Sequence, residues 1–129
     1  MNLHKYIKEN SINDNYKTLF ITKAGVSVLE GIDDRHSLPL HSNIPNAVYG
    51  VLAQDETYLT EIRIYDENGD IIIELANHPK PITNTDIDYV CMLHYHTYKE
   101  RIRQPGKRIK QHPEIENKYY DYIQELIEL

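Results

Sequence analysis

The sequence contains no tryptophan, one phenylalanine and a single cysteine among its 129 residues. One thiol cannot close an internal disulfide, and it is a poor basis for a zinc–thiolate site. The sequence also lacks any run of the roughly 20 apolar residues needed to cross a bilayer, and its N-terminus lacks the apolar core of a signal peptide. These absences predict a cytoplasmic protein without disulfides or membrane spans.

The residues that are abundant favour a folded domain with a substantial sheet. Ile, Leu, Val and eleven Tyr dominate the apolar residues, and these types suit pleated surfaces. The length and the 40% hydrophobic content fit one domain over residues 1–129. The formal charge of −6 argues against a dedicated nucleic-acid coat, but residues 99–112 carry a local charge of +5. A basic strip is therefore expected on an acidic body.

Helical spacing of apolar residues predicts a helix at each end of the chain. Leu3, Tyr6 and Ile7 predict a short helix near the N-terminus. Pro113, which suits a first helical turn, begins an amphipathic segment that extends to Leu129. Between these ends, alternating apolar residues and turn signals predict an antiparallel β-meander of about five strands. The expected fold is α+β, with the C-terminal helix packed on one face of the sheet.

The hairpin around Asn68-Gly69 is the clearest local signal, because this pair favours a two-residue type I′ turn. Counting outward from the turn gives the pairs on one side of the ribbon: Tyr65 with Ile72, Arg63 with Glu74, Glu61 with Ala76, and Leu59 with His78. The pairs on the other side are apolar and face the core: Ile64 with Ile73, and Ile62 with Leu75. The first side is expected to face solvent, a ligand or a covering loop.

The stretch "LHYHTY", residues 93–98, places two histidines on one face of a probable strand. Residues two apart in a strand lie about 6.5 to 7 Å apart on the same side, so His94 and His96 can converge on one ligand. A zinc site needs at least three protein ligands, and His78, Asp86 or Asp88 could supply the third. The sequence predicts no cofactor unless His78, His94 and His96 bind zinc.

A second interpretation is metal-independent RNA cleavage. Histidine suits general acid and general base roles near neutral pH, and the candidates are His78, His94 and His96. Arg63 could bind a phosphate group with both of its terminal nitrogens. Other candidates for RNA binding are the cations that could follow the backbone, Lys99, Arg101, Arg103, Lys107 and Arg108, and the rings that could stack on bases, Tyr95 and Tyr98.

Two further interpretations remain open at this stage. The histidines, the pairing of Arg63 with Glu74, and the basic strip are also typical of a solvated surface without chemistry. The chain could instead be a non-enzymatic binder or inhibitor of a host protein, recognised through its acidic surface and its tyrosines. The partners that the sequence suggests are thus RNA or a host protein, and it does not suggest a membrane.

A series of short motifs resembles small proteins of Gram-positive phages and mobile elements that are described as polymorphic-toxin-like domains. The matching residues, in order, are Ser37-Leu38-Pro39, Ser42 with Pro45-Asn46, Tyr65-Asp66 with Gly69, His78, and His94 with His96 and Tyr98. The chain has Leu93 and Tyr98 where the family tends to have Pro and Trp. The resemblance implies a mobile-element context and a nuclease-type toxin.

Overall fold

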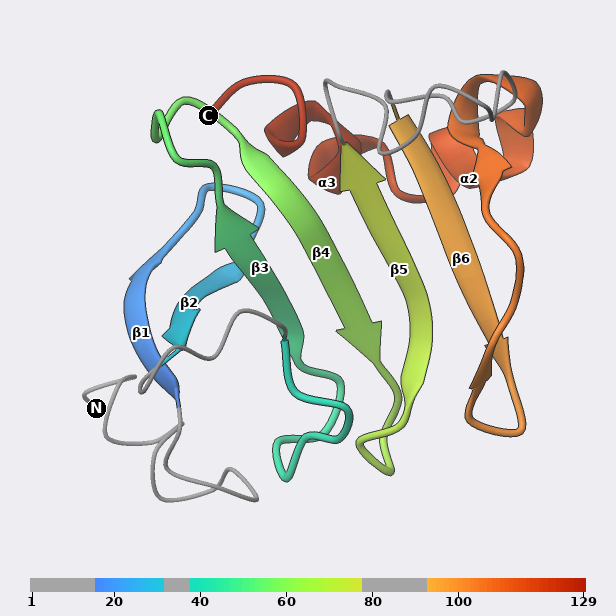
Figure 1. Cartoon of the computed structure of the whole chain (residues 1–129), viewed down its shortest axis with the longest axis horizontal. Coiled ribbons are helices and arrows are strands. Elements are labelled where there is room, and N and C mark those ends of the chain that lie inside the picture. The colour runs from blue at the N-terminus through green and yellow to red at the C-terminus, as the bar shows by residue number, and fades with distance from the viewer. Residues whose placement is uncertain (1–15, 32–37, 78–92) are drawn as a thin grey trace.

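The computed structural model describes residues 16–31, 38–77 and 93–129, which form one sheet with short helices against it (Figure 1). The strands, in chain order, are β1 Tyr16–Ile21, β2 Ser27–Gly31, β3 Val48–Leu52, β4 Leu59–Tyr65, β5 Ile71–Asn77, β6 Leu93–Lys99, β7 Ile102–Arg103 and β8 Lys107–Arg108. Strands β1 to β7 follow one another across the sheet, and β8 also pairs with β6.

The prediction of a five-stranded antiparallel meander with a helix at each end is wrong. Over the described residues the sheet has eight strands, and it is mixed because β2 and β3 pair in parallel. A parallel pair needs a connection that returns to the starting end of the sheet, and residues 38–47 are the described part of that connection. Strands β7 and β8 lie within the basic strip of residues 99–112, for which the sequence had predicted no strand.

The C-terminal segment is helical but is not one helix. It comprises a 3-10 turn Ile109–Gln111, α2 Pro113–Lys118 and α3 Tyr120–Glu125. Tyr119 separates the two helices, since its backbone (φ −112°, ψ 27°) leaves the helical conformation while its ring enters the core. Ile127 and Leu129, expected on the apolar side, are exposed. The predicted N-terminal helix lies outside the described residues.

The register predicted from Asn68-Gly69 is confirmed over the middle of the hairpin. Arg63 pairs with Glu74, Glu61 with Ala76, and Ile62 and Ile64 with Leu75 and Ile73. Near the turn a bulge places Tyr65 opposite Ile71, so the predicted pairing with Ile72 is wrong. A second irregularity, in the pairing of β3 with β4, lets Leu59 join the core on the side of Ile62. The predicted pairing of Leu59 with His78 lies outside the described residues.

The two faces of the sheet are covered differently. The helix face carries Ile62, Leu75 and Tyr95, which are buried in one cluster with side chains of the C-terminal helices. The opposite side, which we call the loop face, carries Arg63, Glu74, His94 and His96 along its β4–β6 part and a cluster around Tyr49 and Tyr65. This division follows from strand geometry, because successive side chains point to opposite faces.

Residues 38–47 cover part of the loop face and are fixed to the hairpin turn. The amide of Ser42 donates to the carbonyl of Gly69, and the Ser42 hydroxyl hydrogen-bonds to the Tyr49 hydroxyl at 2.7 Å. Gly69 has φ +83°, and a Cβ there would lie 1.8 Å from the Ser42 carbonyl oxygen. The Asn46 amide donates to the Asp66 carbonyl. The motif residues Ser42, Asn46, Asp66 and Gly69 therefore hold this loop on the sheet.

The last hairpin uses an unusual turn. Glu100 (φ 50°) and Arg101 (φ 66°) connect β6 to β7, and both adopt the left-handed conformation that glycine and asparagine favour. This conformation costs about 1–2 kcal/mol for each ordinary residue. The turn is therefore held by its surroundings, including the ion pair between Arg101 and Asp70 at 3.5 Å.

Candidate functional site

Two rows of side chains cross the loop face toward the β6 edge. Cross-strand pairing aligns Tyr49, Arg63, Glu74 and His96 in the first row. It aligns Val51, Glu61, Ala76, His94 and Arg108 in the second row. Opposed residues on one face lie about 5 Å apart, so each row brings its polar groups into contact range. The two predicted histidines thus lie beside charged residues of three strands.

Arg63 lies at the buried end of this arrangement. The residue is 7% exposed. Its Nη1 donates to the Leu38 carbonyl at 2.9 Å and to the Pro39 carbonyl at 3.4 Å. Its Nε lies 2.9 Å from Glu61 Oε1, and its Nη2 lies 3.4 Å from Glu74 Oε1. These contacts occupy the guanidinium, so Arg63 organises the site and does not present its nitrogens to a phosphate.

Glu74 connects the buried arginine to an exposed one. Its residue is 2% exposed, and its Oε2 lies 2.8 Å from Nη2 of Arg103, a side chain that is 52% exposed. Glu74 therefore joins Arg63 inside the protein to Arg103 at the sheet edge. The sequence had suggested Arg103 only as one of several backbone-binding cations, because nothing local shows that β7 returns alongside β6.

The two carboxyl groups of this network differ in protonation. Burial, a hydrogen bond with Glu74 and the negative charge of Glu74 raise the pKa of Glu61 to about 8. Burial also disfavours the charged form of Glu74, but the hydrogen bond from Glu61 and the two arginines outweigh it and lower the pKa of Glu74. At neutral pH Glu61 is mainly protonated and Glu74 is ionised. The side chains of Glu61, Glu74, Arg63 and Arg103 together then carry a net charge of +1.

His94 and His96 form a close pair at the edge of this network. Their ring centroids are 5.2 Å apart and the rings meet edge to face. His96 Nδ1 lies 2.8 Å from the Gln104 carbonyl oxygen, which can only accept a hydrogen bond, so Nδ1 carries the proton. Burial lowers the pKa of His96, and the ring is therefore neutral at pH 7 with a basic Nε2.

Gly106 leaves space beside the basic nitrogen of His96. A Cβ at this position would lie 2.9 Å from His96 Cε1 and 3.3 Å from His96 Nε2. Only a residue without a side chain leaves that space empty, so a small group can approach Nε2 from this side. Sequence reasoning did not identify Gly106, although a glycine beside a proline in a basic strip indicates a turn.

The remaining predicted RNA-binding residues are divided between the two faces. Arg108 pairs across the strands with His94 and so shares its face, whereas Lys107 pairs with Tyr95 and Lys99 with Ile102. Tyr95 is 5% exposed, packs in the helix-face core and meets His112 edge to face. It is therefore not available to stack on a base. Tyr98 lies on the loop face with His96 and is partly buried.

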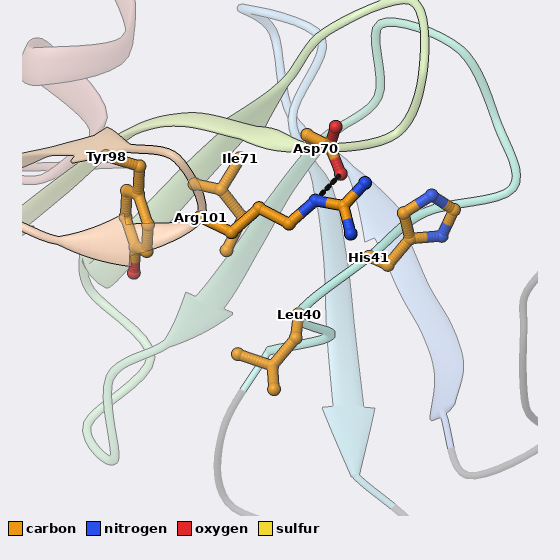
Figure 2. A pocket seen from close by; sticks show the side chains of 6 residues that line it. All are labelled: Leu40, His41, Asp70, Ile71, Tyr98 and Arg101. Carbon is orange, nitrogen blue, oxygen red and sulfur yellow. Dashed lines mark ion pairs between the residues drawn. The ribbon is translucent and has the colours of Figure 1, made fainter.

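A pocket of about 470 Å³ lies next to Tyr98 on the same face. Its lining residues come from the covering loop, the Gly69 turn with the start of β5, and the β6–β7 hairpin: Leu40, His41, Asp70, Ile71, Tyr98 and Arg101. Figure 2 shows the Arg101 side chain extending to Asp70, with Tyr98 at one end of the pocket and His41 at the other. Of these residues the sequence had suggested only Tyr98 and Arg101.

No three His, Cys, Asp or Glu side chains come together as a metal site among residues 16–31, 38–77 and 93–129. These residues therefore provide no ligand set for a zinc ion. His78, Asp86 and Asp88 lie outside the described residues. A zinc site that uses them thus stays a prediction. The same holds for the catalytic role suggested for His78.

Comparison with known proteins gives no relative. No protein-family model, curated protein or solved structure matches this chain. Within the part of the chain that the structure describes, no helix is both long and apolar enough to span a membrane.

Proposed function

We propose that this protein cleaves single-stranded RNA by metal-independent acid–base chemistry at His94 and His96. The observation that carries the proposal is the pair of imidazoles, 5.2 Å apart, beside a buried charge network at the edge of the sheet. Two histidines can supply the base and the acid that phosphodiester transesterification requires. A toxin role on a phage or mobile element belongs to the same proposal and rests on the motif resemblance alone.

The hydrogen bond between His96 Nδ1 and the Gln104 carbonyl assigns the roles of the two rings. His96 Nε2, neutral and basic because Nδ1 is bonded to Gln104, takes the proton from the ribose 2′-hydroxyl. The 2′-oxygen then forms a bond to phosphorus while the bond from phosphorus to the 5′-oxygen breaks. His94 gives its proton to the departing 5′-oxygen. The products are a 2′,3′-cyclic phosphate and a 5′-hydroxyl, so atoms and charges balance.

The phosphate is held by Arg103 and Arg108 in this scheme, in place of Arg63. Arg103 is half exposed while Glu74 fixes its position, and Arg108 lies opposite His94 on the neighbouring strand. Protonation of Glu61 leaves the network with a surplus positive charge, which favours an anion at this edge. Developing negative charge on the phosphate oxygens would be stabilised in the same way.

The test is cleavage of an RNA oligonucleotide by the purified protein in the presence and absence of EDTA. We expect cleavage to persist in EDTA, to fall by at least 100-fold in His94→Ala and in His96→Ala, and to remain in His112→Ala. His112 is a suitable control because its ring contacts Tyr95 on the other face. If RNA stayed intact with each of the folded proteins, the proposal would be contradicted. If EDTA abolished cleavage, the histidines would be metal ligands and not an acid–base pair.

A second candidate function is non-enzymatic binding to a host protein. Strand β1, at one end of the described sheet, exposes three consecutive apolar side chains, Leu19 (44%), Phe20 (40%) and Ile21 (50%). Exposed apolar side chains that gather in this way are typical of a protein–protein contact. A Phe20→Lys variant that loses partner binding while wild type leaves RNA intact would favour this function over cleavage.

A further inference from the structure

We propose that the pocket beside Tyr98 binds a guanine base of the RNA and so sets the preferred cleavage position. This inference rests on the proposed function, because it assigns a substrate subsite next to the histidine pair. Guanine binding in the pocket does not itself require cleavage of RNA, so the two can be tested separately. The pocket volume of about 470 Å³ lies within the range of small-molecule sites.

The position of the pocket fits the base of a nucleotide whose phosphate lies at the histidines. Tyr98 follows His96 by two residues on β6 and shares its face, so the two side chains are about 6.5 to 7 Å apart along the strand. Arg103 pairs across the strands with Tyr98 and contacts Glu74. A phosphate between His96 and Arg103 therefore places the attached base at the level of Tyr98.

The walls of the pocket suit a planar ring. Tyr98 and Ile71 come from strands of the sheet, and Leu40, with 76% of its surface exposed, lines the pocket from the covering loop (Figure 2). Leu40 is the most exposed large apolar side chain among the described residues. Its exposure would be reduced by a base stacked between it and Tyr98. Aromatic and aliphatic walls by themselves accept any base.

The polar groups at the pocket distinguish guanine from the other bases. Arg101 Nε and Asp70 Oδ1 are 3.5 Å apart, so a donor and an acceptor stand side by side (Figure 2). The hydrogen-bonding edge of every base has a donor next to an acceptor. Guanine alone has two adjacent N–H groups that can donate to a carboxylate, together with an oxygen that can accept from a guanidinium. Guanine can thus use both oxygens of Asp70 as well as Arg101.

The backbone around the pocket is arranged to hold these two side chains. Arg101 extends toward Asp70 from a turn whose two residues both have positive φ. Local strain of this kind is concentrated at ligand sites, where the surroundings impose it. On the other side, His41 Nε2 hydrogen-bonds to the Asn68 carbonyl at 2.9 Å, and the backbone of His41 pairs with Asp70. Backbone pairing therefore holds the His41 side of the pocket before a ligand enters, and Arg101 already extends toward Asp70 on the other side.

The experiment is a calorimetric titration of the His94→Ala/His96→Ala protein, which separates binding from cleavage. The probes are guanosine 3′-monophosphate, adenosine 3′-monophosphate and inorganic phosphate. We expect the guanosine nucleotide to bind at least about tenfold more tightly than the adenosine nucleotide. Asp70→Asn should reduce this preference to less than about twofold, whereas Asp121→Asn, at an exposed position of helix α3, should retain it. Arg101→Gln provides a second variant if Asp70→Asn fails to fold.

Equal affinity for the two nucleotides, or a guanosine preference that survives Asp70→Asn and Arg101→Gln, would overturn the guanine subsite. If wild type nevertheless cleaved RNA without base preference, the proposed function would stand and the subsite alone would be wrong. A guanosine preference that depends on Asp70, in a wild-type protein that leaves RNA intact, would support the pocket and contradict the cleavage proposal.

Discussion

The two faces of the sheet bury their side chains by opposite means. On the helix face, apolar side chains such as Ile62, Leu75 and Tyr95 pack against the C-terminal helices, and burial of apolar area stabilises them. On the loop face, Arg63 and Glu74 are as inaccessible as that core but carry charge. Their desolvation is offset by their mutual contact, by Glu61 and Arg103, and by the carbonyls of Leu38 and Pro39.

Under the proposed function, this difference separates the residues that stabilise the sheet from those that position the histidine pair. The helix face can hold the sheet together without positioning any reactive group. The loop face uses costly buried charges, which position Arg103 and surround the histidine pair. A buried ion network is weak evidence for stability, and its presence beside two imidazoles is better explained by the site.

Alanine substitutions of neighbouring residues on β5 compare the two faces directly. Leu75→Ala should lower the free energy of unfolding by about 2–5 kcal/mol through a cavity. Glu74→Ala should lower it by about 3–5 kcal/mol, because Arg63 loses a buried partner. Urea denaturation at pH 7 measures both. A loss below about 1 kcal/mol for Glu74→Ala would mean that the network is not needed to hold this face.

Gly106→Ala should impair cleavage while leaving the fold intact. The added Cβ would meet His96 Cε1 at 2.9 Å, so the imidazole must move. A shift of a catalytic side chain by about 1 Å lowers the rate by about 10- to 100-fold. The kcat/KM on an RNA oligonucleotide measures the loss, and urea denaturation serves as the control. Unchanged cleavage would show that the space beside His96 Nε2 is not used.

Glu61→Gln should change how stability depends on pH. The folded pKa of Glu61, about 8, lies above its ordinary value, so folding retains a proton that the unfolded chain releases. This contribution is complete below the unfolded pKa and disappears as pH rises through the folded pKa. As the pH rises from 5 to 8, the free energy of unfolding therefore falls by up to about 1.4 kcal/mol per pH unit.

The measurement is urea denaturation of both proteins across that pH range. His96, whose pKa burial lowers, acts in the opposite direction near its own titration, and it does so in wild type and variant alike. The difference between the two proteins therefore isolates Glu61. Parallel pH profiles for wild type and Glu61→Gln would contradict the protonated state assigned to Glu61.

Lys17→Gln should have the smallest effect on stability, because it removes an ion pair that is exposed to solvent. Lys17 pairs with Glu30 at 2.9 Å across β1 and β2, yet their side chains are 48% and 51% exposed. Water and salt screen such a pair, so its loss should change the free energy of unfolding by less than about 0.5 kcal/mol. Denaturation in low and high salt measures it. A cost comparable to that of Glu74→Ala would remove the distinction between buried and exposed charges.

The sequence predicted what local rules determine. Asn68-Gly69 fixed a turn, and the count from that turn gave the pairing of Arg63 with Glu74 correctly. Alternation in "LHYHTY" placed His94 and His96 together, and the same alternation excludes Tyr95 from their face. Predicting a stacking role for Tyr95 was inconsistent with that pattern.

The sequence did not predict features that depend on distant segments. Arg63 and Glu74 were expected to face solvent, a ligand or a covering loop, but nothing near them in the sequence shows that Leu38 and Pro39 are the residues that cover them. Strands β7 and β8 are two residues each and are separated by Gln104-Pro105-Gly106, so no alternation indicates them. The parallel pairing of β2 with β3 likewise depends on a long connection, where turn chemistry does not fix the direction.

The chemistry of the cleaved end tests the central claim most directly. Wild-type protein in EDTA would be given an RNA oligonucleotide and a matched oligonucleotide with deoxyribose at every position, and the products identified by mass spectrometry. Attack by a 2′-oxygen activated at His96 predicts a 2′,3′-cyclic phosphate from RNA and no cleavage of the deoxyribose strand. Cleavage of both strands, or of neither, would contradict the assignment of His94 and His96 as an acid–base pair.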